Sequence, residues 1–190
     1  YQNFDQASMG ENADGFAAKL RIGPGNVFRG CRAWNNADDG WDLFASNDVV
    51  VIDNCWAFSN GKVNGRNPAG DGNGFKLGGE DISVNHTVRR SIAFHNGKHG
   101  FTYNRNLGTM TISNNLSIDN DSGNRNFNFD GGTSVFRNNT SCRFNGSGTN
   151  DRIVGSSDSS NQFWMGTNGS RCANFSVALA WSFASHGHLC

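Results

Sequence analysis

The sequence predicts an all-β fold, a parallel β-helix with coils of about 24 residues, in one domain spanning residues 1–190. Composition is the first reason: asparagine outnumbers even the 25 glycines, only 2 prolines occur, and helical periodicity is hard to find. Glycine and asparagine tolerate the left-handed turn conformations that separate short strands. The second reason is an internal repeat, which is visible in two separate ladders of the sequence.

The first ladder is a glycine followed by an aromatic residue. If each copy is one coil, the position two after the glycine becomes Asp42 in one coil and Lys76 in the next. Stacked parallel strands lie about 4.8 Å apart, so Lys76 is expected one coil from a carboxylate. We expect Trp41 and Phe75 to fill the interior of the helix. The copies are Asp14-Gly15-Phe16, Asp39-Gly40-Trp41, Asn73-Gly74-Phe75, His99-Gly100-Phe101 and the glycine-less Asn126-Phe127-Asn128-Phe129.

The second ladder gives the period. Its copies cover residues 31–36, 55–60, 91–96 and 115–120, and a fifth begins at residue 139. A small residue recurs at positions 33, 57, 93, 117 and 141, at intervals of 24, 36, 24 and 24. Apolar residues alternate within each copy, as in strands with one face inward. The aligned asparagines should form an internal ladder of amide hydrogen bonds: Asn36, Asn60, Asn96 and Asn120.

Two regions depart from this period. The interval of 36 residues is longer than the others, and its excess predicts an inserted loop at about residues 61–72, directly before Lys76. Loops on a rigid scaffold often carry binding residues. We expect residues 145–190 to be less regular, with a long loop from Gly146 to Asn161. His186 and His188, close to Cys190, are expected in an exposed terminal segment rather than at a metal.

Charge narrows the range of partners. The 16 basic and 16 acidic residues balance, so the chain lacks the electrostatic signature of a protein that binds nucleic acid or a membrane surface. No apolar run is long enough to span a bilayer. We therefore expect neither kind of partner, and we expect a monomer.

The cysteines and glycosylation sequons bear on compartment. Five cysteines leave at least one unpaired. Cys31 and Cys55 occupy equivalent repeat positions and either stack as small apolar residues or form a bond. One disulfide is expected among Cys142, Cys172 and Cys190, and the sequence does not choose the pair. Several Asn-x-Ser/Thr sequons, such as that at Asn85, add weak support for a secreted, extracellular protein.

An acidic cluster is the strongest chemical signal. Asp14 and Asp39 occupy the same repeat position on successive coils, Asp38 adjoins Asp39, and Asp42 lies three residues further on. Four carboxylates in so small a volume repel one another unless a hard cation lies among them. Ligation by oxygen alone favours Ca²⁺ over Zn²⁺. The sequence therefore predicts a calcium site beside Lys76, which we interpret as a catalytic base. Taken singly, each aspartate is equally compatible with a turn, and Lys76 with a surface ion pair.

These residues carry a resemblance to a known family. The segments at residues 12–19, 30–44 and 70–79 are similar to polysaccharide lyase family 9, and the similarity continues through His86 and residues 93–94 and 99–106. This family contains pectate lyases and rhamnogalacturonan lyases. The resemblance covers about residues 12–129. It implies a right-handed parallel β-helix, a catalytic lysine at Lys76 and calcium ligands at the four aspartates named above.

The resemblance also implies a reaction. A family member would cleave an acidic polysaccharide, polygalacturonate or rhamnogalacturonan, by β-elimination with Ca²⁺. Side chains predicted to hold other substrate carboxylates are Arg66, Arg105, Lys19 and His99, each of which has ordinary surface or structural roles as an alternative. Family members carry several more coils before the first calcium aspartate. We therefore expect this chain to lack N-terminal coils.

Three other classes stay open on the sequence. A β-helix glycosidase would use a pair of carboxylates as acid and base, and Asp38 with Asp39 could supply such a pair. A non-catalytic β-helix would bind polysaccharide through Ca²⁺ without cleaving it. A purely structural solenoid would use Ca²⁺ only to hold its coils together. The products of a reaction distinguish these classes, because only a lyase leaves unsaturated ends.

Overall fold

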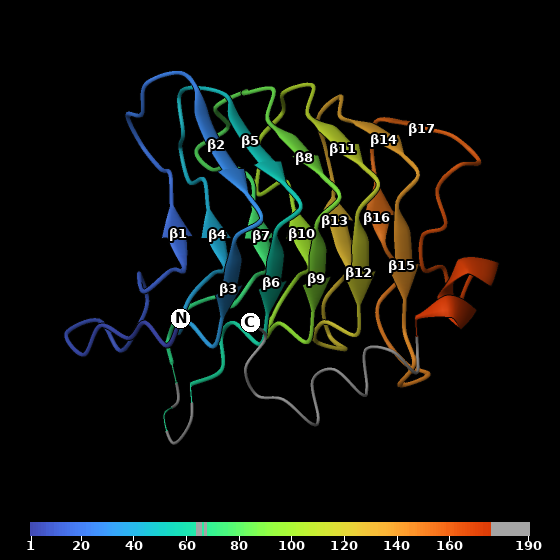
Figure 1. The fold of residues 1–190 in the computed structure, drawn as a ribbon, viewed down its shortest axis with the longest axis horizontal. Coiled ribbons are helices and arrows are strands. Elements are labelled where there is room, and N and C mark those ends of the chain that lie inside the picture. Colours follow the sequence, from blue (N-terminus) through green and yellow to red (C-terminus); the bar gives the residue numbers. More distant parts are fainter. Residues whose placement is uncertain (64–65, 67, 176–190) are drawn as a thin grey trace.

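The chain coils into three parallel sheets around a common interior, as Figure 1 shows for the residues that the computed structural model describes, 1–63, 66 and 68–175. Successive coils pair strand on strand in parallel register. Leu116, for example, is the partner of Ile92 on one side and of Thr140 on the other, an interval of 24 residues each way. The predicted parallel β-helix and its period are confirmed.

Each coil contributes short strands to the three sheets, which we call A, B and C. Sheet A contains β1 (Phe16–Ala17), β4 (Trp41–Asp42), β7 (Phe75–Lys76), β10 (Phe101–Thr102), β13 (Phe127–Phe129) and β16 (Arg152–Ile153). Sheet B contains β2 (Asn26–Arg29), β5 (Val50–Asp53), β8 (Thr87–Arg89), β11 (Thr111–Ser113), β14 (Val135–Arg137) and β17 (Ser156–Ser157). Sheet C contains β3 (Arg32–Trp34), β6 (Trp56–Phe58), β9 (Ile92–Phe94), β12 (Leu116–Ile118) and β15 (Thr140–Cys142). A 3-10 helix, η1, spans Ser170–Asn174.

A column of aromatic rings fills the interior beneath sheet A. The rings of Phe16, Trp41, Phe75, Phe101 and Phe127 stack in that order, with centroids 4.8, 4.8, 4.7 and 5.0 Å apart. These separations match the spacing of paired strands, so each ring lies on its neighbour in offset or parallel contact. Trp41 and Phe75 are fully buried, as predicted. Since side chains alternate along a strand, the residue after each ring projects outward.

The predicted asparagine ladder is present at the turn that leads into sheet A. Asn36 donates its amide to Asn60 (2.8 Å), Asn60 to Asn96 (2.9 Å) and Asn96 to Asn120 (2.8 Å). Asn120 then donates to Asn126 (2.8 Å), which occupies the next rung. Each Oδ1 also accepts the backbone N–H of the preceding rung. The ladder therefore satisfies backbone groups that would otherwise be buried without partners.

The cysteines of the first two coils lie at the turns between sheets B and C, where a further series of hydrogen bonds links successive coils. Cys55 donates its N–H to Ser91 Oγ (3.2 Å), and Ser91 donates its N–H to Asn115 Oδ1 (2.9 Å). The Cys55 thiol reaches the carbonyl of Phe28 at 3.5 Å. Cys31 and Cys55 are both free thiols, so of the two possibilities that the sequence left open, stacking as small apolar residues applies and a bond between them does not. Burial raises the pKa of the Cys55 thiol to about 11.

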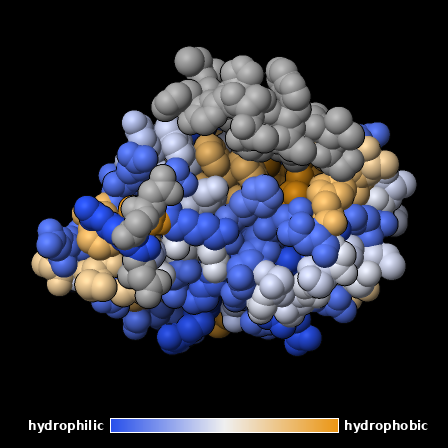
Figure 2. Space-filling view, turned by 90° about the horizontal axis from the view of Figure 1, so that it is seen from below, coloured by the Kyte–Doolittle hydropathy of each residue, from blue (hydrophilic) through white to orange (hydrophobic). Residues whose placement is uncertain are grey.

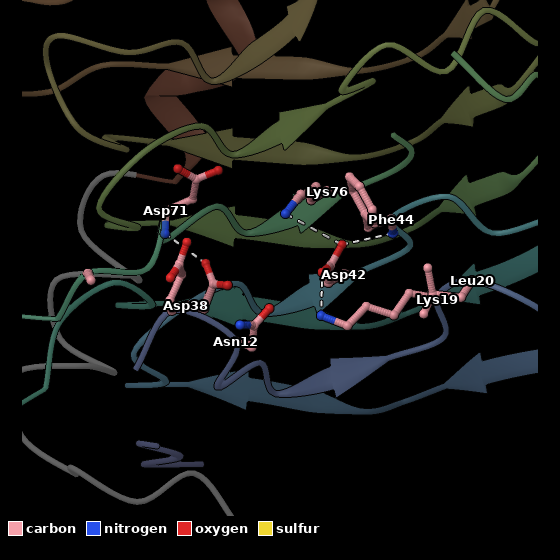
Figure 3. A pocket seen from close by; sticks show the side chains of 10 residues that line it. Asn12, Lys19, Leu20, Asp38, Asp42, Phe44, Asp71 and Lys76 are labelled. Atoms are coloured by element: carbon pink, nitrogen blue, oxygen red, sulfur yellow. Dashed lines mark hydrogen bonds and ion pairs between the residues drawn. The ribbon is translucent and has the colours of Figure 1, made fainter. Parts of the chain in front are cut away.

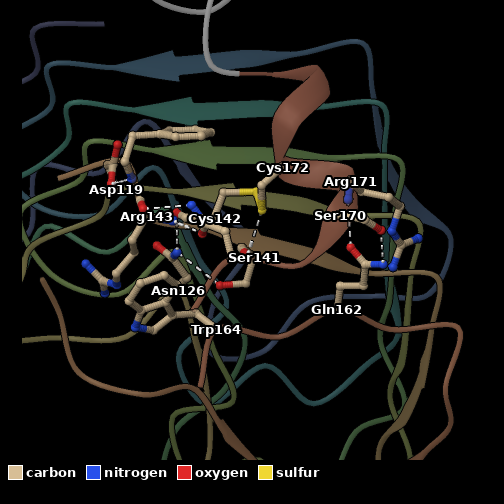
Figure 4. Close-up of a disulfide and its surroundings, with 12 residues drawn as sticks. Asp119, Asn126, Ser141, Cys142, Arg143, Gln162, Trp164, Ser170, Arg171 and Cys172 are labelled. Atoms are coloured by element: carbon tan, nitrogen blue, oxygen red, sulfur yellow. Dashed lines mark hydrogen bonds between the residues drawn. A yellow bond between two sulfur atoms is a disulfide. The ribbon is translucent and has the colours of Figure 1, made fainter. Parts of the chain in front are cut away.

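The structure of the last described coils bears on two expectations, the long loop from Gly146 to Asn161 and the single disulfide. The long loop expected between Gly146 and Asn161 is wrong, because β16 and β17 form there and extend sheets A and B. Parallel pairing is a backbone interaction, so polar residues without the repeat signature still extend the sheets. A disulfide joins Cys142 to Cys172 of η1 (Figure 4). His186, His188 and Cys190 lie outside the described residues.

The outer face of sheet C carries a second, smaller apolar cluster, in which Phe94 packs with Ile118 and the disulfide. Seen from below, the molecule is hydrophilic over most of its surface, with hydrophobic residues in a band toward the upper edge and in a patch at the left end (Figure 2). Among the described residues no helix is long and apolar enough to cross a membrane. The insertion predicted between β6 and β7 is present, and residues 64, 65 and 67 within it lie outside the described part.

Candidate active site and metal centre

Strand register brings the main candidate residues together on the outer face of sheet A. Asp42 of β4 is the direct partner of Lys76 of β7, and Ala17 of β1 is the partner of Asp42 on the other side. Trp41 and Phe75 precede them and point inward, so Asp42 and Lys76 both point outward. The equivalent repeat positions of Asp42 and Lys76 are thus paired positions in sheet A, and the prediction that these residues are neighbours is confirmed.

Three carboxylates converge at this point. Asp14, Asp39 and Asp42 are all buried and each offers an oxygen within 4.8 Å of the other two. Backbone groups fix their orientations, because Asp14 Oδ1 accepts the N–H of Asp39 (3.1 Å) and Asp39 Oδ1 accepts the N–H of Asn73 (2.7 Å). Asp38, also buried, lies at the edge of this cluster. We call Asp14, Asp38, Asp39 and Asp42 the acidic cluster.

Two lysines contact the acidic cluster from different sides. Lys76 Nζ lies 3.2 Å from Asp39 Oδ2 and 3.7 Å from Asp42 Oδ1. Lys19 Nζ lies 2.9 Å from Asp14 Oδ2 and 2.8 Å from Asp42 Oδ2. Asp42 therefore shares its two oxygens between the two ammonium groups, as Figure 3 shows. Lys19 was predicted as a substrate ligand, and here it pairs with the acidic cluster.

Burial and neighbouring like charges perturb the titration of Asp14, Asp38 and Asp39. Burial and the nearby charge of Asp14 raise the pKa of Asp38 to about 6. Burial and Asp38 raise the pKa of Asp39 well above its usual value, and burial with Asp42 raises that of Asp14. Burial disfavours a charged Lys76, yet Asp39 and Asp42 outweigh it and raise the pKa of Lys76. Without a metal the lysine is therefore held protonated by the carboxylates beside it.

The acidic cluster has the donor set of a hard cation. Asp39 Oδ2 is buried and accepts no hydrogen bond among the described residues, and its charge is met by the ion pair with Lys76. Oxygens bound to one Ca²⁺ at 2.3–2.6 Å lie at most about 5 Å apart, and the three converging carboxylates meet this limit at 4.8 Å. No thiol or imidazole contributes to the triad. The residues present thus fit Ca²⁺ and do not suit Zn²⁺.

A cavity of about 380 Å³ opens over the cluster (Figure 3). Lys76 and Lys19 line it together with Asp38 and Asp42, so both amines and two of the carboxylates face the same space. Asp71 also lines the cavity and forms an ion pair with Lys98 at 2.7 Å. Sequence reasoning did not single out the remaining lining residues. They are Glu11, Asn12, Leu20, Phe44, Ala69 and Asp71.

Two of these missed residues did leave a signal. Asn12 and Asp71 both stand three positions before a repeat glycine, so the ladder already placed them in equivalent positions. Asp71 donates its N–H to Asp38 Oδ1 at 2.7 Å and thereby ties the inserted loop to the acidic cluster. Phe44 left no comparable pattern, although its ring lies 5.6 Å from Lys76 Nζ. Phe44 N–H also donates to Asp42 Oδ1 (2.8 Å), which helps to orient that carboxylate.

The other predicted substrate ligands lie elsewhere. Arg66 stacks over the ring of Phe4 at 4.1 Å and lines a separate cavity of about 410 Å³. Arg105 pairs with Asp81 on the surface. His99 is buried, its Nδ1 accepts the N–H of Arg125 at 3.0 Å, and burial lowers its pKa to about 4. None of the three lines the cavity over the acidic cluster.

Fold and site together define a parallel β-helix protein with a cluster of buried carboxylates under a cavity on one outer sheet. The chain belongs to the family described as "Pel9A-like, right handed beta helix region", whose model matches residues 1–147. The helix is accordingly right-handed, as the resemblance implied.

Named relatives agree with this assignment. Pectate lyase L of Paenibacillus polymyxa (strain SC2) is 52% identical over 82% of this chain and 35% of its own length. Pectate lyase L of Dickeya dadantii (strain 3937) is 53% identical over 63% of the chain and 29% of its own length. The chain thus spans about a third of the length of these curated relatives.

Two solved structures share the fold. The crystal structure of pectate lyase Pel9A superposes with a TM-score of 0.79 at 44% identity, covering 96% of this chain and 45% of that one. A rhamnogalacturonan lyase superposes with a TM-score of 0.70 at 31% identity, covering 86% of this chain and 46% of that one.

Proposed function

We propose that this chain is the site-bearing part of a calcium-dependent pectate lyase, which cleaves polygalacturonate by β-elimination outside the cell. The observation that carries the proposal is the ammonium of Lys76, 3.2 Å from an oxygen of a carboxylate cluster that fits a hard cation. The named relatives support the reaction and the substrate class, since the pectate lyases are 44–53% identical to this chain.

The residues have distinct roles in this proposal. Asp14, Asp38, Asp39 and Asp42 would hold Ca²⁺ through their oxygens. The ion would supply Lewis acidity toward the carboxylate of a bound galacturonate, which acidifies the proton on C5. Lys76 faces the cavity and would remove that proton. The C5–H electron pair then forms the C4–C5 double bond as the C4–O4 bond breaks, and the departing O4 takes a proton from water, which leaves a 4,5-unsaturated uronate and a new chain end.

The charge on Lys76 explains why the reaction would need the metal. In the metal-free site Asp39 and Asp42 raise the pKa of Lys76, so its amine holds the proton and cannot act as a base. A divalent cation among the same carboxylates offsets their charge and repels the ammonium. Neutral Lys76 is therefore favoured only when the acidic cluster is filled, which couples base strength to metal occupancy.

A glycosidase is disfavoured by the geometry. Asp38 and Asp39 were the candidate acid and base, but Asp39 is fully buried and does not line the cavity. A rhamnogalacturonan lyase is the second candidate, because a protein of that name shares the fold at 31% identity. A polysaccharide-binding β-helix without catalysis is the third, because the same carboxylates would suit Ca²⁺ whether or not Lys76 acts as a base.

The deciding experiment measures ultraviolet absorbance of unsaturated uronides released from polygalacturonate and from rhamnogalacturonan, each with Ca²⁺ and with chelator. Calcium-dependent product from polygalacturonate supports the proposal. Product from rhamnogalacturonan alone names the second candidate. New saturated reducing ends would show a hydrolase, and binding without product would show a carbohydrate-binding module.

The disulfide between Cys142 and Cys172 supports the extracellular location, because such bonds persist in oxidising compartments. The proposed partner is an acidic polysaccharide.

A further inference from the structure

Lys19 occupies an unusual place for a residue expected to bind substrate. Its ammonium bridges Asp14 Oδ2 (2.9 Å) and Asp42 Oδ2 (2.8 Å), two carboxylates of the acidic cluster whose side chains are only 2% exposed. The Lys19 side chain itself is 24% exposed and lines the cavity of Figure 3. It therefore enters from the solvent side and ends between two of the oxygens that a cation would use.

One pair of oxygens cannot serve two cations at once. Ca²⁺ binds carboxylate oxygens at about 2.3–2.6 Å, closer than the ammonium stands now. An ion at that distance from both Oδ2 atoms would meet the ammonium of Lys19 at close range without an intervening anion. Like charges so close repel strongly in a partly buried site. Entry of the metal therefore requires the Lys19 ammonium to leave.

The cavity that Lys19 lines offers space for its displaced side chain. The backbone around Lys19 is fixed to the next coil, because Ala18 N–H donates to Asp42 O (3.1 Å) and Leu20 N–H donates to Phe44 O (2.9 Å). Only the flexible side chain is free to move, and it already borders the cavity that Lys76 faces. Released there, the ammonium faces the space in which an acidic sugar would lie.

We propose that Lys19 is an internal counter-ion of the empty metal site, that Ca²⁺ displaces it, and that the displaced ammonium binds a substrate carboxylate. The inference rests on the proposed function and adds a coupling to it, in which filling of the metal site prepares the substrate site. It also assigns Lys19 two roles at different stages, as a stabiliser of the empty site and as a substrate ligand of the filled one.

The first test compares calcium affinity by titration calorimetry in the whole chain and in Lys19→Met, which keeps the length of the side chain and removes its charge. The variant has no ion pair to break, so its affinity for Ca²⁺ should rise about tenfold. Lys98→Met is the matched control. It removes one positive charge from an ion pair with Asp71 near the same cavity, but among the described residues Lys98 forms no ion pair with the acidic cluster.

Thermal unfolding provides a second test, which does not depend on catalytic activity. In chelator Lys19→Met should unfold at a lower temperature than the wild type, because two buried carboxylates lose their counter-ion. With saturating Ca²⁺ that difference should shrink, since the ion replaces the ammonium. A variant that binds Ca²⁺ no more tightly than the wild type overturns the inference and leaves the proposed metal site standing. Absence of Ca²⁺ binding in both proteins refutes the metal site and the inference together.

The substrate role is read from steady-state kinetics on polygalacturonate at saturating Ca²⁺. Loss of a carboxylate ligand in Lys19→Met should raise KM several-fold while kcat changes less, because Lys76 remains in place. A fall in kcat with unchanged KM contradicts the substrate role. Lys98→Met should leave both constants near those of the wild type.

Discussion

Asp42 and Lys76 are direct partners on adjacent parallel strands, and their register places an ammonium 3.7 Å from a carboxylate oxygen on the outer face of sheet A. Each follows a buried aromatic ring, so both side chains are directed outward by the same alternation. The relationship depends on strand register rather than on a flexible loop. Substitutions at these positions should therefore change chemistry more than folding.

Replacing Lys76 should abolish the proposed lyase activity without removing the proposed metal site. In Lys76→Met the amine is gone while the aliphatic length is kept, so we expect kcat to fall by about 10²–10⁴-fold. Calcium affinity should stay or rise, because the positive charge beside Asp39 and Asp42 is removed. Release of unsaturated uronides and calorimetry measure the two effects. Activity close to wild type would remove Lys76 from the mechanism, and Lys62→Met serves as a distant surface control.

Replacing the fully buried Asp39 by asparagine should weaken calcium binding without lowering the stability of the metal-free chain. Asn at position 39 still offers an Oδ1 to the N–H of Asn73 but loses the charge that Ca²⁺ requires. The pKa of Asp39 is raised well above its usual value, so burial already disfavours its charged form. We expect Asp39→Asn to lose most calcium-induced stabilisation while its melting temperature in chelator stays equal or rises. Asp48→Asn, at a half-buried position outside the acidic cluster, is the control.

Asp38 should make the metal-free chain less stable as pH rises, against the opposite contribution of His99, whose pKa is lowered to about 4 by burial. The pKa of Asp38 is raised from 3.8 to about 6, so between these values the folded state holds a proton that the unfolded state has lost. Stability from this proton is fully present below about 3.8 and is lost as pH rises through about 6. Calcium binding needs the deprotonated carboxylate, so the stabilisation by Ca²⁺ should grow over the same window. Melting temperatures at a series of pH values, with Ca²⁺ and with chelator, measure both trends.

If Asp38→Asn in chelator shows the same change of melting temperature from pH 4 to pH 7 as the wild type, the charge of Asp38 is not what limits the stability of the metal-free site. Buffers of constant ionic strength keep surface electrostatics from producing the same trend.

Breaking the disulfide should destabilise the last described coils. Cys142 and Cys172 are 30 residues apart, and closing a loop of that length contributes about 3–4 kcal/mol by restricting the unfolded chain. Cys172→Ser should lower the free energy of unfolding in urea by a comparable amount. Cys31→Ser is the matched control, since Cys31 is a free thiol. Equal effects of the two substitutions would show that packing, and not the bond, is responsible.

Equivalence of repeat positions predicted much of the site and the fold. It placed Lys76 beside Asp42, and it predicted the asparagine ladder from Asn36 to Asn120, because stacking converts equal spacing in sequence into contact in space. It did not predict that Lys19 reaches into the acidic cluster. A long side chain that crosses between coils is set by local electrostatics, which leave no period in the sequence.

The sixth coil was missed for a related reason. Residues 146–161 lack the glycine-aromatic signature, and their glycine and serine content is typical of a loop. Arg152 nonetheless pairs with Asn128 and Ser156 with Val135 through the backbone. Pairing onto an existing strand needs only available N–H and C=O groups, so a preceding coil can order a segment that its own sequence does not mark.

The column of stacked rings beneath sheet A has a further consequence. The ring centroids are 4.7–5.0 Å apart, and this contact fixes the spacing between successive coils directly under the site. The 36-residue interval therefore adds its extra residues sideways, in the turn between β6 and β7, and leaves Lys76 one step from Asp42. Such a molecule can acquire longer loops over this cavity while the distance between Lys76 and the acidic cluster stays constant.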